Sequence, residues 1–162
     1  MKVIREWKKV FEQDLDYIVS EFKDSLNTPA LILLEGPVGA GKTTFMKLFV
    51  DSVSSGVDDG EEKQVLSPTY SLIQDVGRVA HADFYRIQER EEIMHLELPL
   101  YLEEKDYFVI EWGKKFLKEV LKDVDQTFNI YCLNVAINEE HLSPSDNSTP
   151  SRNFKLEEVP RS

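Results

Sequence analysis

The chain has 162 residues, of which 41% are hydrophobic and 10% aromatic, so it is long enough for one globular domain with a buried core. Its 30 acidic residues against 19 basic residues give a net charge of -11, which disfavours direct, tight binding to a nucleic-acid backbone. The single cysteine, Cys132, excludes an internal disulfide. The charged N-terminal stretch lacks a signal-peptide core, and no run approaches the roughly 18 apolar residues of a membrane span, so the sequence predicts a cytoplasmic protein without membrane segments.

The first part of the chain predicts a strand, a helix and a second strand that leads into a glycine-rich loop. Residues 2–7 (KVIREW) are compatible with an edge strand, and the apolar side chains of residues 10–26 recur largely at helical spacing. Residues 30–36 (ALILLEG) are apolar up to Glu35, which is typical of a parallel strand covered on both faces. A helix is expected from Lys42 to about Val53.

The rest of the chain alternates between strands and helices. Residues 54–63 are acidic and predict an exposed loop, residues 71–76 and 78–87 predict a strand pair joined around Gly77, and residues 88–104 predict a mostly helical stretch interrupted at Pro99. A buried strand (107–113), an amphipathic helix (114–124), a long strand (127–137) and a last strand (152–159) follow. We find no internal repeat, and we expect a single domain over residues 1–162 with a mobile stretch at 143–151.

Residues 36–43 (GPVGAGKT) match the phosphate-binding pattern G-x-x-x-x-G-K-[ST] in full, between an expected strand and an expected helix. The glycines let backbone N–H groups point at phosphate oxygens, and the helix adds its positive N-terminal dipole. Lys42 is expected to reach the β and γ phosphates, and the Thr43 hydroxyl to ligate Mg²⁺. The candidate nucleotide-binding residues of this segment are Pro37, Val38, Gly39, Ala40, Gly41, Lys42, Thr43 and Thr44. The predicted fold is a three-layer α/β P-loop fold with a mainly parallel central sheet and antiparallel edge strands.

Two acidic residues end apolar runs and are candidates to complete the site. Asp83 follows the apolar stretch of VAHAD, and Glu111 follows YFVI. A carboxylate at the end of a buried strand is costly unless it is paired or lies near a metal, so we expect both at the nucleotide; which one holds Mg²⁺ and which orients water stays open. The chain lacks the D-x-x-G and N/T-K-x-D patterns of GTPases, and its few arginines form no cluster of the kind found in nucleotide-kinase lids.

The segments EGPVGAGKTT, SPTYSLI, HADFYRI and IEWG occur in this order, and in this combination the chain resembles the TsaE (YjeE) family from about Ala30 to Gly113. The resemblance implies an ATPase of tRNA threonylcarbamoyladenosine biosynthesis that works with the partners TsaB and TsaD, of which TsaD modifies adenosine 37 of tRNA. It implies ATP and Mg²⁺ as cofactors and indirect contact with tRNA. It also places Thr69 near the γ-phosphate, Asp83 at the Mg²⁺, and Glu111 and Trp112 beside the nucleotide. The family commonly has proline where this chain has Gly113.

Several alternatives stay open at this point. Thr69 also fits a simple turn after Pro68, Trp112 also fits a core position, and His81 fits hydrogen-bonded support better than direct metal ligation. The rival functions are a small-molecule phosphotransferase and a nucleotide-dependent binding module. Base preference, nucleotide-dependent self-association and the roles of residues 56–62 and 143–151 are not determined. Slow intrinsic ATP hydrolysis is expected, because no arginine finger is evident in the sequence.

Overall fold

A computed structural model of the chain describes residues 1–54, 72–138 and 150–161. Within these ranges the strands form one seven-stranded sheet in the order β1-β7-β6-β2-β5-β4-β3. The strands are β1 (Lys2–Val10), β2 (Ala30–Glu35), β3 (Ile73–Val76), β4 (Val79–Asp83), β5 (Tyr107–Glu111), β6 (Asn129–Ile137) and β7 (Arg152–Glu158). The helices are α1 (Leu15–Asp24), α2 (Lys42–Ser54), α3 (Arg90–Met94), α4 (Leu98–Leu102) and α5 (Leu117–Asp123), with short 3-10 helices η1 (Glu12–Asp14) and η2 (Lys114–Phe116).

The centre of the sheet is parallel and its edges are antiparallel. Strand β2 pairs in parallel with β5 and with β6, and β4 pairs in parallel with β5. Strands β3, β7 and β1 join with antiparallel pairing. Strand β2 is buried on both faces except for the partly exposed Glu35 at its end, because its apolar side chains alternate between two cores. This arrangement confirms the predicted mainly parallel sheet with antiparallel edges.

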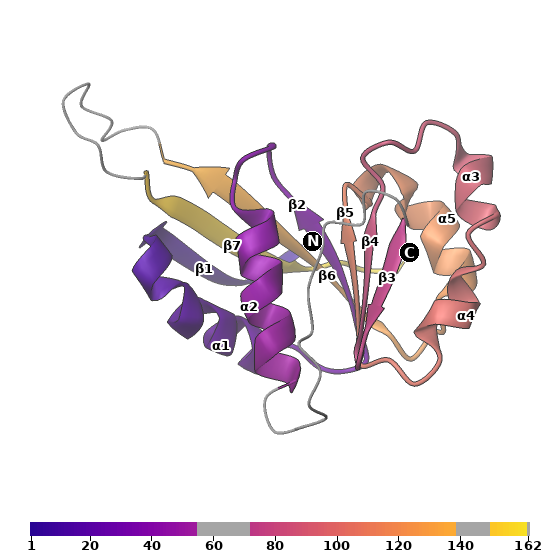
Figure 1. Cartoon of the computed structure of the whole chain (residues 1–162), viewed down its shortest axis with the longest axis horizontal. Coiled ribbons are helices and arrows are strands. Elements are labelled where there is room, and N and C mark those ends of the chain that lie inside the picture. Colours follow the sequence, from indigo (N-terminus) through magenta and orange to yellow (C-terminus); the bar gives the residue numbers. More distant parts are fainter. Residues whose placement is uncertain (55–71, 139–149, 162) are drawn as a thin grey trace.

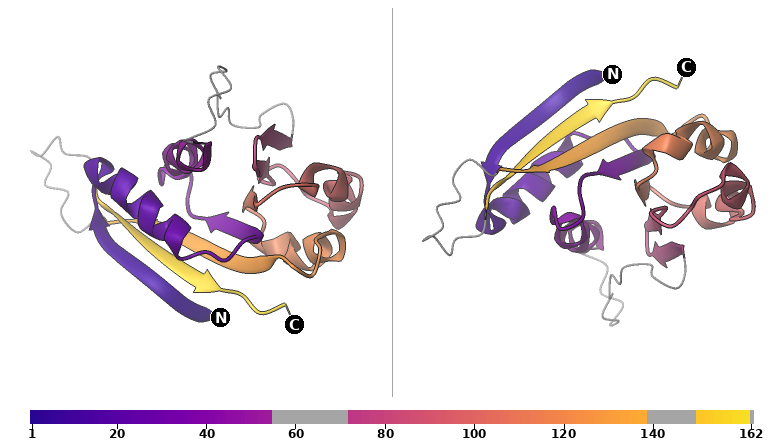
Figure 2. Two further views of the ribbon diagram at one scale, coloured as in Figure 1. Left: turned by 90° about the horizontal axis from the view of Figure 1, so that it is seen from below. Right: turned by 90° about the horizontal axis from the view of Figure 1, so that it is seen from above.

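Helices cover the sheet on both faces and produce the expected three layers (Figure 1). One core packs the apolar sides of α1 and α2 on the sheet, with Phe22, Phe45 and Phe49 in edge-to-face ring contacts. The other core lies under α3, α4 and α5 and includes Ile93 and Val120. Figure 2 shows β1 and β7 side by side, as their antiparallel pairing requires.

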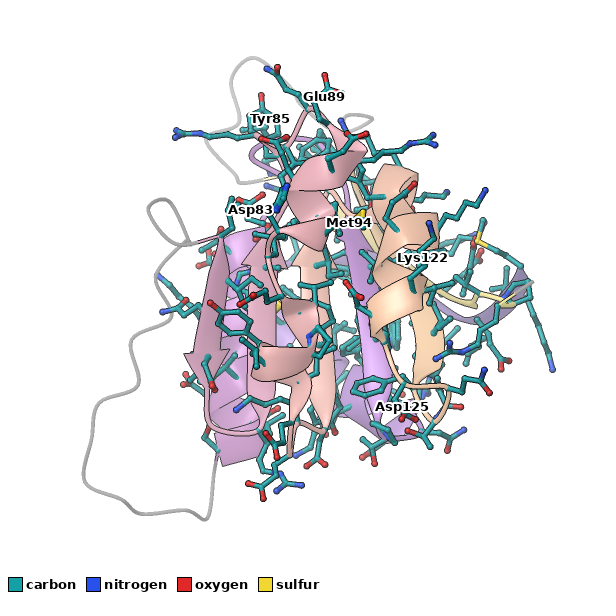
Figure 3. The ribbon with its side chains drawn as sticks, turned by 90° about the vertical axis from the view of Figure 1, so that its right-hand side faces the viewer. Asp83, Tyr85, Glu89, Met94, Lys122 and Asp125 are labelled. Atoms are coloured by element: carbon teal, nitrogen blue, oxygen red, sulfur yellow. The ribbon has the colours of Figure 1, made fainter. Side chains whose placement is uncertain are left out.

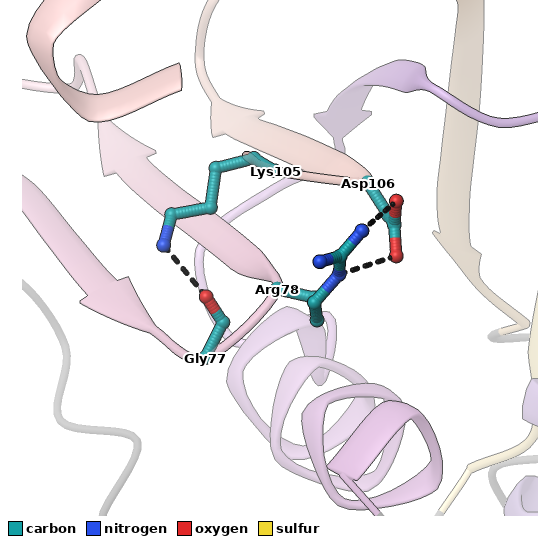
Figure 4. Close-up of polar contacts among 4 residues, drawn as sticks. All are labelled: Gly77, Arg78, Lys105 and Asp106. Carbon is teal, nitrogen blue, oxygen red and sulfur yellow. Dashed lines mark hydrogen bonds and ion pairs between the residues drawn. The ribbon is translucent and has the colours of Figure 1, made fainter. Parts of the chain in front are cut away.

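The β3–β4 turn is tied to the start of β5 by two side chains (Figure 4). The Arg78 guanidinium donates two hydrogen bonds of 2.8 Å to the Asp106 carboxylate, and Lys105 Nζ donates to the Gly77 carbonyl oxygen at 2.6 Å. These contacts hold β4 and β5 in register at one end. Because the strands are parallel and of equal length, they also end together at the other end, where Asp83 pairs with Glu111.

Some element boundaries differ from those predicted. The expected helix over residues 10–26 is shorter, because β1 continues to Val10 and η1 precedes α1. Strand β4 ends at Asp83, whereas the predicted strand ran to residue 87. The helical stretch breaks over residues 95–97 and not at Pro99, because Pro99 stands in the first turn of α4, where proline is tolerated. Residues 55–63 and 143–149, on which an exposed loop and mobility were predicted, lie outside the described residues. None of the helices in the described ranges has the length and apolar character to cross a bilayer.

Candidate functional site

The glycine loop connects β2 to α2 and is held against β6 by a close backbone approach. Gly36 has a φ of 154°, and a Cβ at this position would stand 2.6 Å from the carbonyl oxygen of Val135. No other residue type fits there without moving β6. Gly39 and Gly41 also have positive φ, at 84° and 94°. Such positive φ angles are the kind that loops use to turn successive N–H groups toward an anion.

Lys42, the first residue of α2, is folded back over the loop. Its Nζ donates a 2.8 Å hydrogen bond to the Gly36 carbonyl oxygen and lies 4.0 Å from the centre of the Trp112 ring. The residue is only 6% exposed, and burial lowers the pKa of Lys42, while the negative charges of Glu111, Glu35 and Asp83 oppose this shift. One ammonium group thus lies near three carboxyl groups. This excess of negative charge favours binding of a cation, or of a phosphate together with a cation, over binding of a phosphate alone.

Asp83 and Glu111 stand at the ends of adjacent parallel strands and form a register pair on the face of the sheet covered by α2. Glu111 is 6% exposed, and its Oε2 lies 2.8 Å from His81 Nε2. Asp83 is partly exposed, and its Oδ1 accepts a 3.0 Å hydrogen bond from the Tyr85 N–H. Figure 3 shows Asp83 and Tyr85 together at one end of the sheet, opposite the end that carries Asp125.

Two aromatic side chains form one wall of the site. Trp112 follows β5 directly with a φ of 60°, a left-handed conformation that is uncommon for a bulky residue. The rings of Tyr85 and Trp112 lie with their centroids 5.2 Å apart at an interplanar angle of 54°. Tyr85 is 60% exposed. The turn after β5 thus places the Trp112 ring beside Lys42. Trp112 therefore does not take the core position that the sequence also allowed.

Most of the predicted site residues border one cleft of about 410 Å³. Its lining comprises Val38, Gly39, Gly41, Lys42, Thr43, Asp83, Tyr85, Glu111 and Trp112. Ala40 is buried, and with Thr44 it borders a separate apolar pocket of about 150 Å³. Pro37 is exposed and borders neither space. Thr69 lies outside the described residues, so its predicted place near the γ-phosphate stays a prediction.

Besides Tyr85, two residues that contact this region were not among the predicted site residues. Arg152, the first residue of β7, donates from Nε to the Ala40 carbonyl oxygen at 2.9 Å and from Nη2 to the Gly39 carbonyl oxygen at 3.4 Å. Glu35, at the end of β2, accepts a 2.9 Å hydrogen bond from the Lys114 N–H, and burial raises the pKa of Glu35. No local pattern marks Arg152, whereas the carboxyl end of the strand before a P-loop was a recognisable position for Glu35.

The donor groups around the cleft fit Mg²⁺ together with a polyphosphate. A threonine hydroxyl and two carboxylates are hard oxygen ligands, and Mg²⁺ in such sites takes its other ligands from phosphates and water. In the described part of the chain no three His, Cys, Asp or Glu side chains gather to hold a metal ion by themselves.

A family model described as threonylcarbamoyl adenosine biosynthesis protein TsaE matches residues 11–142 of the chain. Among curated proteins named tRNA threonylcarbamoyladenosine biosynthesis protein TsaE, that of Nostoc is 35% identical over 100 residues, covering 57% of each chain. That of Haemophilus influenzae is 29% identical over 104 residues, covering 62% of this chain and 61% of the relative. The chain thus spans about three fifths of the length of these two relatives.

Among solved structures, the crystal structure of Bacillus subtilis YdiB superposes with a TM-score of 0.58 at 18% sequence identity. The superposition covers 96% of this chain and 86% of YdiB. At this level of identity the likeness concerns the fold. The chain has the three-layer α/β P-loop architecture predicted from its glycine loop and apolar strands.

Proposed function

Because the chain belongs to the TsaE family of threonylcarbamoyl adenosine biosynthesis proteins, we propose that it serves tRNA threonylcarbamoyladenosine biosynthesis as a subunit that binds and hydrolyses ATP. The observation that carries this proposal is the meeting of P-loop and strand-end groups on one cleft, namely Lys42, Thr43, Asp83 and Glu111. A lysine, a hydroxyl and two carboxylates at a glycine loop are the groups that phosphoryl transfer with Mg²⁺ requires.

The phosphates are proposed to lie along the loop, with the backbone N–H groups and Lys42 as their donors. Lys42 leaves the Gly36 carbonyl oxygen and turns its ammonium to the phosphates, an exchange of one acceptor for a more highly charged one. The Thr43 hydroxyl and the carboxylates of Asp83 and Glu111 would hold Mg²⁺ or a water molecule on it. When bound there, Mg²⁺ neutralises phosphate charge during transfer.

The base is proposed to lie in the apolar pocket on the other side of the loop. This pocket borders Gly41 and Thr44, so it continues the line from the loop past the start of α2. Its apolar walls come from Phe11, Leu15 and Phe154, Glu12 and Arg152 also border it, and Phe11 is 46% exposed and accessible for stacking. Its volume of about 150 Å³ suits a flat base better than a bulky acceptor.

Hydrolysis by the chain alone is proposed to be slow. Within the described ranges no arginine borders the cleft at Lys42, and the guanidinium of Arg152 is engaged by loop carbonyl oxygens on the other side. An arginine at the γ-phosphate typically speeds phosphoryl transfer by about 10³–10⁵-fold. TsaB- and TsaD-like partners are the proposed source of such a group. With a net charge of -11, the subunit is proposed to meet tRNA through these partners, in the cytoplasm.

A small-molecule phosphotransferase is the second candidate, and one observation favours it. A cleft of about 550 Å³ lies on the other side of Tyr85 and Trp112 and carries the exposed Lys114 and Lys115. A cleft of this size has room for an acceptor, with the two lysines as sites for an anionic group. In this reading Asp83 or Glu111 would act as the base for the acceptor hydroxyl.

The two readings separate in one set of assays. Phosphate release from ATP is measured for the chain alone, with purified TsaB- and TsaD-like partners and tRNA, and with a panel of nucleosides and sugars. We expect slow release alone, faster release with the partners, and no phosphorylated acceptor. We expect Asp83→Asn to impair Mg²⁺-dependent phosphate release much more than it impairs the stability of the fold, measured as the melting temperature. A phosphorylated small molecule would establish the phosphotransferase instead. Gel filtration of the same samples with and without ATP reports partner binding and self-association.

A further inference from the structure

We propose that His81 is a positioning residue that fixes the Glu111 carboxylate in the nucleotide cleft through its Nε2–H. The proposal rests on the proposed function, in which Glu111 holds the nucleotide-bound Mg²⁺ or orients the attacking water. It assigns a role to a buried polar side chain that borders neither the cleft nor the base pocket.

The two side chains meet because of the register between β4 and β5. His81 pairs with Val109, and Glu111 lies two residues further along β5 on the same face. Diagonal neighbours of this kind are within reach of long side chains. His81 Nε2 and Glu111 Oε2 stand 2.8 Å apart, with only 3% and 7% of the respective side chains exposed. The contact is short, and protein surrounds it.

The hydrogen-bond pattern determines which ring nitrogen carries the proton. An ionised carboxylate only accepts hydrogen bonds, so Nε2 is the donor. His81 Nδ1 is buried and has no hydrogen-bond partner among the described residues. Nε2 is therefore the ring nitrogen that carries the hydrogen of this contact.

The bond restricts a carboxylate that would otherwise be free to turn. Glu111 has one more side-chain torsion than Asp83, and it must stay beside the cleft although most of it is buried. Asp83 is held by its own chain, through the N–H of Tyr85 two residues on. Glu111 has no such local support among its described contacts, and His81 supplies the support from the neighbouring strand. The two carboxylates are thus fixed by different means.

A pair of variants separates positioning from packing. His81→Gln keeps an N–H donor that can reach Glu111, together with an acceptor in place of Nδ1. His81→Leu keeps a side chain of similar size but has no hydrogen-bonding group. We expect His81→Leu to raise the Mg²⁺ concentration for half-maximal nucleotide binding and turnover by about 10–100-fold, the usual effect of removing a hydrogen-bond partner of a ligand. We expect His81→Gln to restore most of that loss and Mg²⁺-free nucleotide affinity to stay unchanged in both. His95→Leu, a histidine outside the site, is the matched control.

We expect His81 to act through Glu111, and this gives a second test. In a Glu111→Ala background, His81→Leu should add no further change in Mg²⁺ dependence, because the supported group is already absent. Equal impairment of the Gln and Leu variants, or a wild-type Mg²⁺ dependence in His81→Leu, would overturn the positioning role.

The geometry also has a readout that needs neither nucleotide nor turnover. The chain has three histidines, so ¹⁵N-labelled imidazole spectra are simple to assign. We expect an Nε2–H signal for His81 that is protected from solvent exchange in the unliganded protein and loses that protection in Glu111→Ala. An Nδ1–H form, or a signal indifferent to Glu111→Ala, contradicts the proposal. If the wild type instead fails to bind Mg²⁺–ATP while the spectra are as expected, the proposed function fails and the His81–Glu111 contact stands.

Discussion

Replacing Arg152 by methionine tests whether the last strand sets the shape of the phosphate loop. Arg152 donates to the Ala40 carbonyl oxygen at 2.9 Å, to the Gly39 carbonyl oxygen at 3.4 Å and to the Pro150 carbonyl oxygen at 2.6 Å. In a trans peptide the C=O and the following N–H point in opposite directions. Holding the Ala40 carbonyl toward β7 therefore directs the Gly41 N–H away from Arg152, as a phosphate site requires.

The size of the effect follows from these contacts. A hydrogen bond from a charged donor contributes about 1.5–3 kcal/mol, and the partial exposure of Arg152 argues for the lower end. The Gly39 contact is too long to add much, and the Pro150 contact lies outside the loop. Loss of the Ala40 contact thus leaves the loop about 1.5 kcal/mol less biased toward its binding conformation. Since 1.4 kcal/mol is a factor of ten, we expect nucleotide affinity to fall by up to about tenfold.

Calorimetric titration with nucleotide and Mg²⁺, together with urea unfolding, provides the measurement. Arg161→Met is the matched control, because Arg161 also donates to two backbone carbonyl oxygens, those of Asp125 and Phe128, at a place distant from the loop. Both variants should lose stability, and only Arg152→Met should lose affinity. An Arg152→Met protein that binds nucleotide as tightly as Arg161→Met would refute the argument that β7 shapes the loop.

Three further results are expected. Burial lowers the pKa of Lys42 from its ordinary value of 10.5, so its ammonium charge is lost at a lower pH than that of an exposed lysine. As the pH is raised, calorimetry should show nucleotide affinity starting to decline before pH 10.5 is reached, and Lys42→Met should bind weakly and without this dependence. Nucleotide draws the Lys42 ammonium from its place 4.0 Å from the Trp112 ring, so fluorescence of a Trp7→Phe protein should change on binding, whereas a Trp112→Phe protein should stay silent. Gly36→Ala should lower the free energy of unfolding in urea by more than about 2 kcal/mol, because backbone strain adds to a Cβ contact at 2.6 Å. Gly39→Ala, with open space around its Cβ, should lower it by about 1 kcal/mol. Equal losses in the two variants would contradict the close approach of Gly36 to β6.

Features encoded in short stretches of chain were predicted from the sequence. The apolar runs of β2 and β5 indicate strands buried on both faces; Gly36 of the loop follows β2 directly, and Glu111 is the last residue of β5. Two strands of that kind, a glycine loop and a helix are enough to predict a P-loop architecture, because parallel strands bring their carboxyl ends to one edge. The convergence of Asp83 on the same edge follows from its position at the end of a third apolar stretch.

Features that depend on register and on distant pairing were not predictable. The hydrogen bond between His81 and Glu111 requires β4 and β5 to be adjacent with a specific offset, and a sequence shows neither. The place of Trp112 over Lys42 depends on a left-handed turn at a residue type that rarely adopts one. Arg152 approaches the loop from a strand that joins the sheet antiparallel at the far side of β6. The role predicted for Thr69 lies outside the described residues.

The contact between Arg152 and Ala40 joins residues separated by 112 positions, which bears on the order of events during synthesis. The glycine loop leaves the ribosome before β5 and β6, which flank its strand β2, and before Arg152 of β7, which contacts its carbonyl oxygens. Contacts over such separations form only after the intervening chain has emerged. While these residues are being made, the nascent chain therefore carries the glycine loop without the scaffold that shapes it. We expect a nucleotide bound at the loop to stabilise the folded chain with β7 in place rather than a folding intermediate that lacks β7.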